Sequence, residues 1–361
     1  RLTQVNYTSD NRVECKAMLE SSAVYTPAAL GVAPSTTGPT TLAPLGPAIY
    51  ALLDIPRLSS GQDVVGFPVA MAGADPTWPG GVLMRSADAG ATYDEPLDFA
   101  PPGATIGTAS TTIGAVESRL IDAASRLTVT LTSGSLSDFS ELSMLAGANH
   151  FAYGAAGRWE IIAARTCTLQ SGSTYIISNM LRGRFGSEWA MGLHATGDTV
   201  VLLDSSDLQM LSQSNADIGA SRLYRAITAG RDFSTDADRA MTYGGVNLKP
   251  LSPVYLNGAR DPGTADWSIE WIRRTRVGGE WRDGVDAELG EASEAYDIEI
   301  YADGSYTSVK RTITAAAPSC AYSSADQVTD FGSNQGTLYI RVYQRSATVG
   351  RGYPLTTSIT R

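Results

Sequence analysis

Short runs in which apolar and polar side chains alternate recur along the whole chain, separated by Gly, Pro, Asn, Asp and Ser. A period of two is the pattern of β-strands with one buried face, and it is clearest at residues 127–131, 199–203 and 338–343. Helical spacing is weak, and we expect one or two helical turns at residues 138–146, capped by Asp138. The pattern therefore predicts an all-β chain.

A composition break near the start separates two parts of the chain. Residues 26–47 are rich in Pro, Thr, Ala and Gly, and such a segment cannot hold a core, so we expect an extended linker there. Residues 1–25 include an alternating run at residues 12–18, and the chain opens on Arg1 with neither an initiator Met nor a signal-peptide pattern. We therefore expect residues 1–25 to be the end of an upstream domain of a longer polypeptide.

The remaining length divides again at a Pro-containing point, residues 249–253. We expect residues 48–250 to form a β-rich sandwich domain, either as one domain or as two units that meet near residues 100–104. A chain of 361 residues is too long for one ordinary core, and about a hundred residues is the usual size of a sandwich domain. The sequence therefore predicts β-sandwich domains in series.

The last segment, residues 251–361, has the clearest strand patterns. In residues 267–271 the large apolar side chains lie on one face of a strand and the polar side chains on the other, and residues 296–300 repeat this pattern. A strand-like run at residues 338–346 then leads into a Gly-containing turn at residues 349–354. This ending resembles the penultimate strand and turn of fibronectin type III modules, so we expect the last domain to be fibronectin type III-like.

The charge of the chain bears on its partners. The net charge is −10, and the basic residues are scattered singly, so the chain would repel a phosphate backbone and we expect no nucleic-acid binding through this segment. The basic residues are mostly arginines, since the lysines are Lys16, Lys249 and Lys310. Arginine suits packing between subunits, because its planar guanidinium binds carboxylates in pairs and stacks on aromatic rings. A GC-rich coding genome would give the same bias without a physical purpose.

Groups suited to catalysis are scarce. His150 and His194 are the two histidines, they lack metal-binding spacing, and neither a Gly-x-Ser-x-Gly motif nor a glycine-rich phosphate loop accompanies them. We expect a structural role for both histidines and no catalytic residue, cofactor or metal. Cys15, Cys167 and Cys320 are odd in number and far apart, which favours buried free thiols over disulfides or a zinc site.

Acidic residues keep glycoside cleavage open as an alternative, since that reaction needs two carboxylates at a fixed separation. The candidates for such a pair are Asp94, Glu95, Asp98, Glu141, Glu160 and Glu188. A chain this acidic offers carboxylate pairs in many places, so the composition favours none of them.

Residues 86–93 match the Asp-box pattern of sialidase-type propellers, Ser-x-Asp-x-Gly-x-x-aromatic. In those proteins the motif is a hairpin device in which the carboxylate, here that of Asp88, binds turn amides and the aromatic ring packs beneath the turn. Propellers repeat the motif, whereas this chain carries it once. We therefore expect a single structured hairpin turn.

Residues 179–189 read Asn-Met-Leu-Arg-Gly-Arg-Phe-Gly-Ser-Glu-Trp. The glycines suit turn conformations, and Arg182 and Arg184 can each bind carbonyls or carboxylates. We expect a structural turn locked by a pair between arginine and Glu188, with a ligand site as the alternative. Trp281 stands in a polar loop and is a candidate for a protein or glycan contact.

The same segment continues into His194, Gly197-Asp198 and residues 200–204, which gives Leu-Arg-Gly-x-x-Gly-Ser-Glu, then His, Gly-Asp and Leu-Leu. This arrangement resembles the C-terminal part of the large tail-tip protein of gene transfer agents and related siphophages, the baseplate-hub or host-specificity "megatron" family. Further similarity lies at residues 51–56, 78–83 and 269–283. The resemblance spans roughly residues 48 to 350.

The resemblance implies a structural virion protein at the distal end of the tail, assembled in the host cytoplasm. Its partners would be itself, as a homotrimer about the tail axis, and other tail and baseplate proteins. It also implies a longer parent protein with hub domains upstream and no catalytic residues in this part. Two alternatives remain open, a carbohydrate- or receptor-binding module of a tail fibre tip that contacts a host surface glycan, and a glycoside hydrolase.

Overall fold

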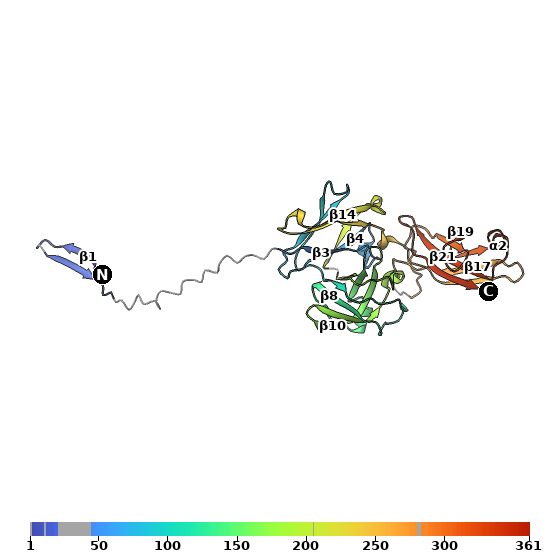
Figure 1. The fold of residues 1–361 in the computed structure, drawn as a ribbon, viewed down its shortest axis with the longest axis horizontal. Coiled ribbons are helices and arrows are strands. Elements are labelled where there is room, and N and C mark those ends of the chain that lie inside the picture. Colours follow the sequence, from blue (N-terminus) through green and yellow to red (C-terminus); the bar gives the residue numbers. More distant parts are fainter. Residues whose placement is uncertain (1, 11, 21–44, 205, 280–282) are drawn as a thin grey trace. The chain divides into compact units, whose positions relative to one another are not determined.

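The computed structural model describes residues 2–10, 12–20, 45–204, 206–279 and 283–361, in two compact units, Arg1–Pro44 and Leu45–Arg361. Strands make up most of the regular structure in the described part of the chain, as Figure 1 shows, and the predicted all-β fold is confirmed. None of the helices within these ranges has the length and apolar character needed to cross a membrane.

The first unit holds an antiparallel hairpin of β1 (Leu2–Tyr7) and β2 (Val13–Ala17). The alternating run at residues 12–18 supplies β2. The side chains of both strands are exposed. Most of the segment expected to be a linker, residues 26–47, lies outside the described residues, which resume at Leu45.

Two sheets of the second unit pack face to face as a sandwich, one with the strand order β13-β4-β3 and the other with the order β15-β14-β5-β6. The strands are β3 (Ala48–Leu52), β4 (Gly66–Gly73), β5 (Gly81–Ser86), β6 (Asp94–Phe99), β13 (Leu208–Ser212), β14 (Ser221–Thr228) and β15 (Arg239–Thr242). Between the sheets, Phe67, Val69 and Met71 of β4 join Leu83 and Tyr224 of the facing sheet in one core. Burying such a side chain contributes about 1.5–3 kcal/mol.

Strand β4 is buried on both faces, and the sizes of its alternating side chains show how. Phe67, Val69 and Met71 belong to the sandwich core, whereas Ala70 and Ala72 belong to a second core on the other face. That second core joins the sheet to a barrel formed by residues 106–202. The small alanine side chains let the barrel approach the sheet closely, so this strand reads as a continuous apolar run rather than an alternating one.

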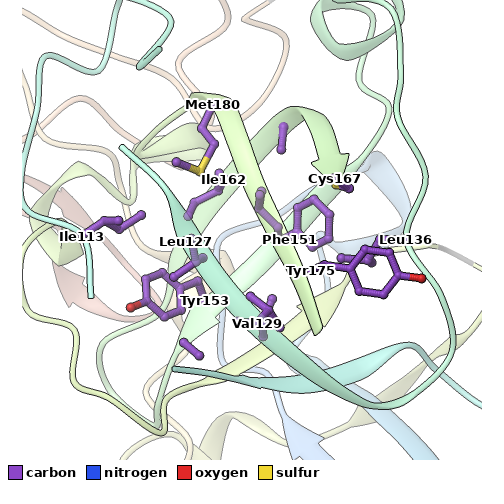
Figure 2. Close-up of a cluster of buried hydrophobic side chains, with 14 of the residues drawn as sticks. Ile113, Leu127, Val129, Leu136, Phe151, Tyr153, Ile162, Cys167, Tyr175 and Met180 are labelled. Atoms are coloured by element: carbon purple, nitrogen blue, oxygen red, sulfur yellow. The ribbon is translucent and has the colours of Figure 1, made fainter. Parts of the chain in front are cut away.

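The barrel is closed and has the strand order β10-β11-β8-β7-β12-β9. Its strands are β7 (Ile106–Ala109), β8 (Leu127–Ser133), β9 (His150–Gly154), β10 (Glu160–Ser171), β11 (Thr174–Leu181) and β12 (Thr199–Leu202). Figure 2 shows the interior, where Leu127, Val129, Phe151, Ile162 and Met180 come from four different strands and pack together. Closure pairs every strand on both sides, so the barrel has no exposed sheet edge.

The chain forms the barrel as an insertion into the sandwich. It leaves the sandwich after β6, crosses Pro101 and Pro102 into the barrel, and returns with β13. The sequence suggested a possible junction near residues 100–104, and the chain enters the barrel at this point. The sequence did not predict the barrel itself or the return to the sandwich at Leu208, because barrel and sandwich strands share the same period of two.

The last part of the chain is a second sandwich, in which the sheet β16-β17-β20 faces the sheet that contains β19, β18, β21, β22 and β23. Its elements are β16 (Val254–Arg260), β17 (Trp267–Ile272), β18 (Tyr296–Tyr301), β19 (Val309–Ala315), β20 (Ser319–Tyr322), α2 (Ser324–Phe331), β21 (Thr337–Ser346), β22 (Gly350–Arg351) and β23 (Leu355–Thr360). This is the strand order of a fibronectin type III-like sandwich, as predicted. Trp267, Ile269 and Trp271 of β17 are buried between exposed polar neighbours.

The outer face of β18 differs from a simple half-buried strand. The sequence placed the apolar side chains of residues 296–300 on one face, and these are buried in the core. Asp297 and Glu299 on the other face are also buried, because the guanidinium of Arg351 donates to Asp297 at 2.7 Å and to Glu299 at 2.6 Å. An arginine from β22 therefore covers this face of the sheet.

The helix α1 (Glu141–Leu145) begins later than predicted. Its cap is Ser140, whose hydroxyl accepts a hydrogen bond from the amide of Ser143, and not Asp138. The carboxylate of Asp138 accepts instead from the amide of Cys167 at 2.6 Å, which ties the segment to β10. Short 3-10 helices occupy several connections: η2 (Ser60–Gln62), η3 (Arg184–Gly186), η4 (Glu188–Ala190), η5 (Asn215–Asp217), η6 (Phe233–Thr235) and η7 (Val246–Leu248).

Candidate functional site

The turn that follows β11 directs two arginines to different surroundings. Arg182 is fully buried, whereas Arg184, two residues later, is exposed. Gly183 between them has φ +60°, and a Cβ atom there would lie 2.8 Å from the backbone Cα of Glu188. Only glycine fits this conformation and this close approach. The predicted need for glycine in the turn therefore has a physical basis at Gly183.

Arg182 is the centre of a buried polar cluster at one end of the barrel. Its guanidinium donates two hydrogen bonds to the carboxylate of Glu160, at 2.6 and 2.8 Å. The same carboxylate accepts from the amide of Gly183 at 3.0 Å and lies 2.7 Å from Nε2 of His194. The side chains of Arg182, Glu160 and His194 have no exposed surface, and the His194 ring stacks on Tyr153.

Hydrogen bonds control the charge of Glu160. Burial by itself raises the pKa of this carboxyl, but the hydrogen bonds from His194 and Arg182 outweigh it and hold the pKa below its ordinary value. Asp198 closes the cluster on the other side, where it pairs with Arg158 and lies 3.7 Å from Nδ1 of His194. Each of these carboxylates is thus held ionised by a partner, which is the arrangement of a structural network.

This cluster is not open to a substrate. Glu160 and Arg182 are both fully buried and line neither of the two cavities described below. His194 is held between the carboxylate of Glu160 and the ring of Tyr153. His150 lies at the start of β9, where its Nδ1 is 2.9 Å from the carbonyl of Gly147. Burial lowers the pKa of His150 below its ordinary value; the hydrogen bond to Gly147 raises it by less, and the charge of Arg184 adds a smaller lowering.

A larger cavity of about 720 Å³ lies where the sandwich, the barrel and the C-terminal module meet. Its cationic lining residues are Arg57, Arg119, Arg184, Lys249, Arg274 and Arg276. The lining carboxylate is that of Glu188. We call this cavity, with these seven residues, the basic cleft. It stands out in a chain whose net charge is −10.

Part of the basic cleft is a joint between modules. Arg274 of the C-terminal module donates to Glu188 of the barrel at 2.6 Å and to the carbonyl of Ser252 at 2.6 Å. Arg276 pairs with Asp63, which precedes β4. These charge-assisted contacts link three parts of the chain that are far apart in sequence.

Aromatic and backbone contacts complete the joint. The ring of Trp189 stacks on Tyr353, with centroids 4.9 Å apart and an angle of 18° between the planes. Arg57 donates to the carbonyl of Arg276 at 3.2 Å. The joint thus combines stacking, ion pairs and backbone hydrogen bonds, which together hold the three parts in one compact unit.

The sequence expectation for Glu188 needs correction. We expected Glu188 to lock its own turn by pairing with a nearby arginine. In the structure Arg182 pairs with Glu160, and Glu188 pairs with Arg274, which is 86 residues away. The pairing is set by docking of the C-terminal module, which a local sequence pattern cannot show.

The structure places Asp88 in a different region. The hairpin between β5 and β6 carries it, and its carboxylate accepts from the hydroxyl of Thr92 at 2.6 Å and from the amide of Thr92 at 2.9 Å. Those hydrogen bonds and one from Ser86 lower the pKa of Asp88 to about 2. Tyr93 packs against Phe233 with ring centroids 5.0 Å apart. Asp88 therefore has the surroundings of a hairpin turn, away from the basic cleft.

The remaining candidates are spread over the molecule. Trp281 lies outside the described residues. Of the proposed carboxylate pair members, Asp94 pairs with Arg85 at 2.5 Å and Glu141 with Arg165 at 3.4 Å. Among the described residues, no group of His, Cys, Asp and Glu has the arrangement needed to hold a metal ion.

Sequence reasoning missed most of the basic cleft. Residues 273–276 contain three arginines directly after a half-buried strand. This cluster was a usable signal, because arginines gathered at a strand end are typical of an interface. Nothing in the local sequence marks Arg57 or Lys249, which reach the cleft from connections of the sandwich.

Comparison with known proteins gives one family match. A search of curated proteins returned no match. A chicken structure described as the CNTN1 FN1-FN3 domains is 12% identical, with 88% of this chain and 99% of that chain covered, at a TM-score of 0.22. The fibronectin type III-like assignment therefore stands on the strand order given above. Residues 104–201, which form nearly the whole barrel, match the model of the family described as Rcc01698-like, C-terminal.

Proposed function

We propose that this chain is a structural part of the tail tip of a phage or gene transfer agent, and that it acts by assembly. The sequence resemblance to the tail-tip megatron family supports this proposal over roughly residues 48 to 350. The family match over residues 104–201 falls within that region. In this role the chain would form part of the distal end of the tail and contribute to host contact and tail opening.

The observation that carries the proposal is the joint around Arg274 and Trp189. A tail tip has to pass a mechanical signal from host contact to the tail tube, which requires domains that move as one body. The ion pair of Arg274 with Glu188 and the stack of Trp189 on Tyr353 restrain the C-terminal module against the barrel. Such a joint suits transmission of force through a series of β domains.

The buried cluster supports the same role. A fully buried Arg182–Glu160 pair adds specificity of packing to the barrel, although an apolar pair of the same volume could be as stable. Partners in the proposed role are two further copies of this chain about the tail axis and other tail and baseplate proteins. Assembly would take place in the host cytoplasm and the product would be the virion.

Labelling of intact particles tests the proposal. The parent protein would carry an epitope tag after Arg361, and particles would be decorated with gold-labelled antibody and viewed by electron microscopy. We expect gold at the distal tip of the tail, with a tagged head protein as the control that labels elsewhere. Particles that lack the chain, or gold away from the tail tip, would contradict the proposal.

A further inference from the structure

We propose that the basic cleft is a binding site for the anionic groups of an acidic oligosaccharide, with Arg184 and Lys249 as the residues that bind these groups. This proposal stands on the charges and shape of the cleft. It does not depend on the assignment of the chain to a tail tip.

The cations of the basic cleft fall into two classes. Arg119, Arg274 and Arg276 each pair with carboxylates, so their charges are already used in the structure. Arg57 and Arg184, by contrast, form no ion pair among the residues that the structure describes. An excess of unpaired guanidinium groups in one cavity favours a ligand that brings negative charge.

Lys249 adds a third positive charge to the cleft. Its ammonium group lies 5.5 Å from the centre of the Tyr353 ring. The same group lowers the pKa of Asp54, but burial of that carboxyl has the larger effect and its pKa stays above the ordinary value. Asp54 is occupied by hydrogen bonds from the amides of Gly244 and Val246. Lys249 therefore remains able to bind an anion in the cleft.

The turn that places Arg184 at the cleft contains a residue with a strained backbone conformation. Phe185, which follows it, has the left-handed values φ 56° and ψ 27°, which a residue with a side chain rarely adopts. Such conformations cost about 1–3 kcal/mol and persist where the surrounding structure requires them. Here the conformation leaves Arg184 exposed while the Phe185 ring packs on His150, with centroids 5.2 Å apart. The strained turn thus places beside an aromatic ring a guanidinium that forms no ion pair with any described residue.

A second cavity of about 550 Å³ adjoins the cleft and supports the choice of a saccharide. Both cavities are lined by Leu58, Ser59 and Phe185, so the two form neighbouring compartments. The second is lined by rings and hydroxyl groups, including those of Phe139 and Ser137, and its charged lining residue is Asp204. Sugar rings pack on aromatic side chains and bond to hydroxyls, while their acidic groups would go to the cationic compartment.

The other anionic ligands fit less well. A nucleic acid would meet the field of a chain with net charge −10 along most of its length. The volume of the cleft, about 720 Å³, lies within the range of small-molecule sites and accommodates a few sugar units rather than a protein domain. An acidic oligosaccharide therefore satisfies both the charge and the size.

Calorimetric titration of the full chain tests the proposal with a matched pair of probes. Tetragalacturonate supplies a carboxylate on each sugar, and its methyl ester has the same rings without charge. Inorganic phosphate serves as a third probe. We expect tetragalacturonate to bind, the methyl ester to bind at least about tenfold more weakly, and affinity to fall with added salt.

Variants assign the binding to named residues. Arg184→Gln and Lys249→Gln should each weaken tetragalacturonate binding about tenfold, the loss expected for one charge-assisted contact. Arg165→Gln is the matched control, since Arg165 is an exposed arginine of the barrel outside both cavities, and binding should stay within about twofold. Because Arg184 is exposed and unpaired among the described residues, its replacement should leave folding intact.

Four results would overturn the proposal. One is the absence of tetragalacturonate binding, and another is equal binding of the methyl ester. A third is an Arg184→Gln variant that binds as the Arg165→Gln control does. The fourth is tighter binding of phosphate or of an oligonucleotide of equal charge, which would assign the cleft to another anion. None of these results bears on where the chain lies in a particle, so the tail-tip proposal would still be tested separately.

Discussion

Replacement of Arg182 by Met tests whether the buried cluster holds the barrel together. The substitution keeps much of the side-chain volume but removes two hydrogen bonds to Glu160 and one to the carbonyl of Gly114. It also removes the 3.6 Å ion pair with Asp122. Glu160 would then keep contacts with the amide of Gly183 and with His194, and would lose its paired positive charge. The Glu160 carboxylate would remain buried without its arginine partner.

The structure sets the size of the effect. Removal of one partner from a buried ion pair costs about 3–5 kcal/mol, because the remaining charge cannot return to water. Arg182 and Glu160 have no exposed surface, so the upper half of this range applies. With a urea slope of about 2 kcal/mol per M, the unfolding midpoint of the barrel should fall by about 2 M. Adding Glu160→Gln to Arg182→Met should recover about half of the loss, because the charge of Glu160 is then gone while that of Asp122, 3.6 Å from Arg182 in the intact barrel, remains.

Hydrogen exchange in urea, followed by mass spectrometry of β10 and β11 peptides, measures this loss in the full chain. A peptide-resolved assay is needed because a chain of several domains does not unfold as one two-state system. Arg165→Met is the control, since Arg165 lies on β10 with Glu160 but is half exposed, and its effect should stay within about 0.5 kcal/mol. A loss below about 1 kcal/mol for Arg182→Met, or no recovery in the double variant, would show that the Arg182–Glu160 pair does not hold the barrel together.

Other parts of the molecule give further expectations. The pKa of Asp88 is lowered from 3.8 to about 2, first by the Thr92 hydroxyl, so the hairpin gains stability that is present above pH 3.8 and lost as the pH falls toward 2. Hydrogen exchange of the Thr92 amide should therefore accelerate as the pH falls from 3.8 toward 2. The same acceleration in an Asp88→Asn variant would contradict this expectation. Gly183→Ala should cost about 1–3 kcal/mol in the barrel exchange assay, because its Cβ would meet backbone at positive φ, and an unchanged stability would be contrary evidence. Arg274→Met should cost about 1 kcal/mol and make amide exchange at the joint about fivefold faster, whereas unchanged exchange would show that the ion pair does not restrain the module. Burial raises the pKa of Cys167 to about 11, so alkylation at pH 8 should be far slower than for an exposed thiol, and rapid labelling would show that the barrel opens.

The strand patterns in the sequence predict much of the fold, but they do not predict that six of the strands close into a barrel. Residues 267–271 were predicted as a half-buried strand, and β17 has this alternation because one of its faces meets solvent. Strand β4 has no such alternation, since the barrel covers its second face through Ala70 and Ala72. Whether a set of alternating strands closes into a barrel depends on which strands pair, and that information lies in contacts between distant residues.

In the candidate site, too, features set by neighbouring residues could be predicted, whereas contacts between distant residues could not. The need for glycine at residue 183 could be inferred locally, because the turn requires it. The partner of Glu188 could not be inferred, because Arg274 reaches it through docking of a separate module. The buried pair of Arg182 and Glu160 is likewise created by the pairing of β10 with β11 in the closed barrel. The sequence pattern drew attention to Arg184 and Glu188, which line the cleft, but it could not assign the partner of Glu188.

A cryo-electron microscopy map of the intact particle would show directly where this chain lies. We expect density for the unit Leu45–Arg361 at the distal end of the tail, in three copies about the tail axis, with the C-terminal module docked on the barrel through Arg274 and Glu188. A map whose tail tip has no density that fits this unit would contradict the account. Recovery of the parent protein as a free monomer absent from particles would contradict it equally.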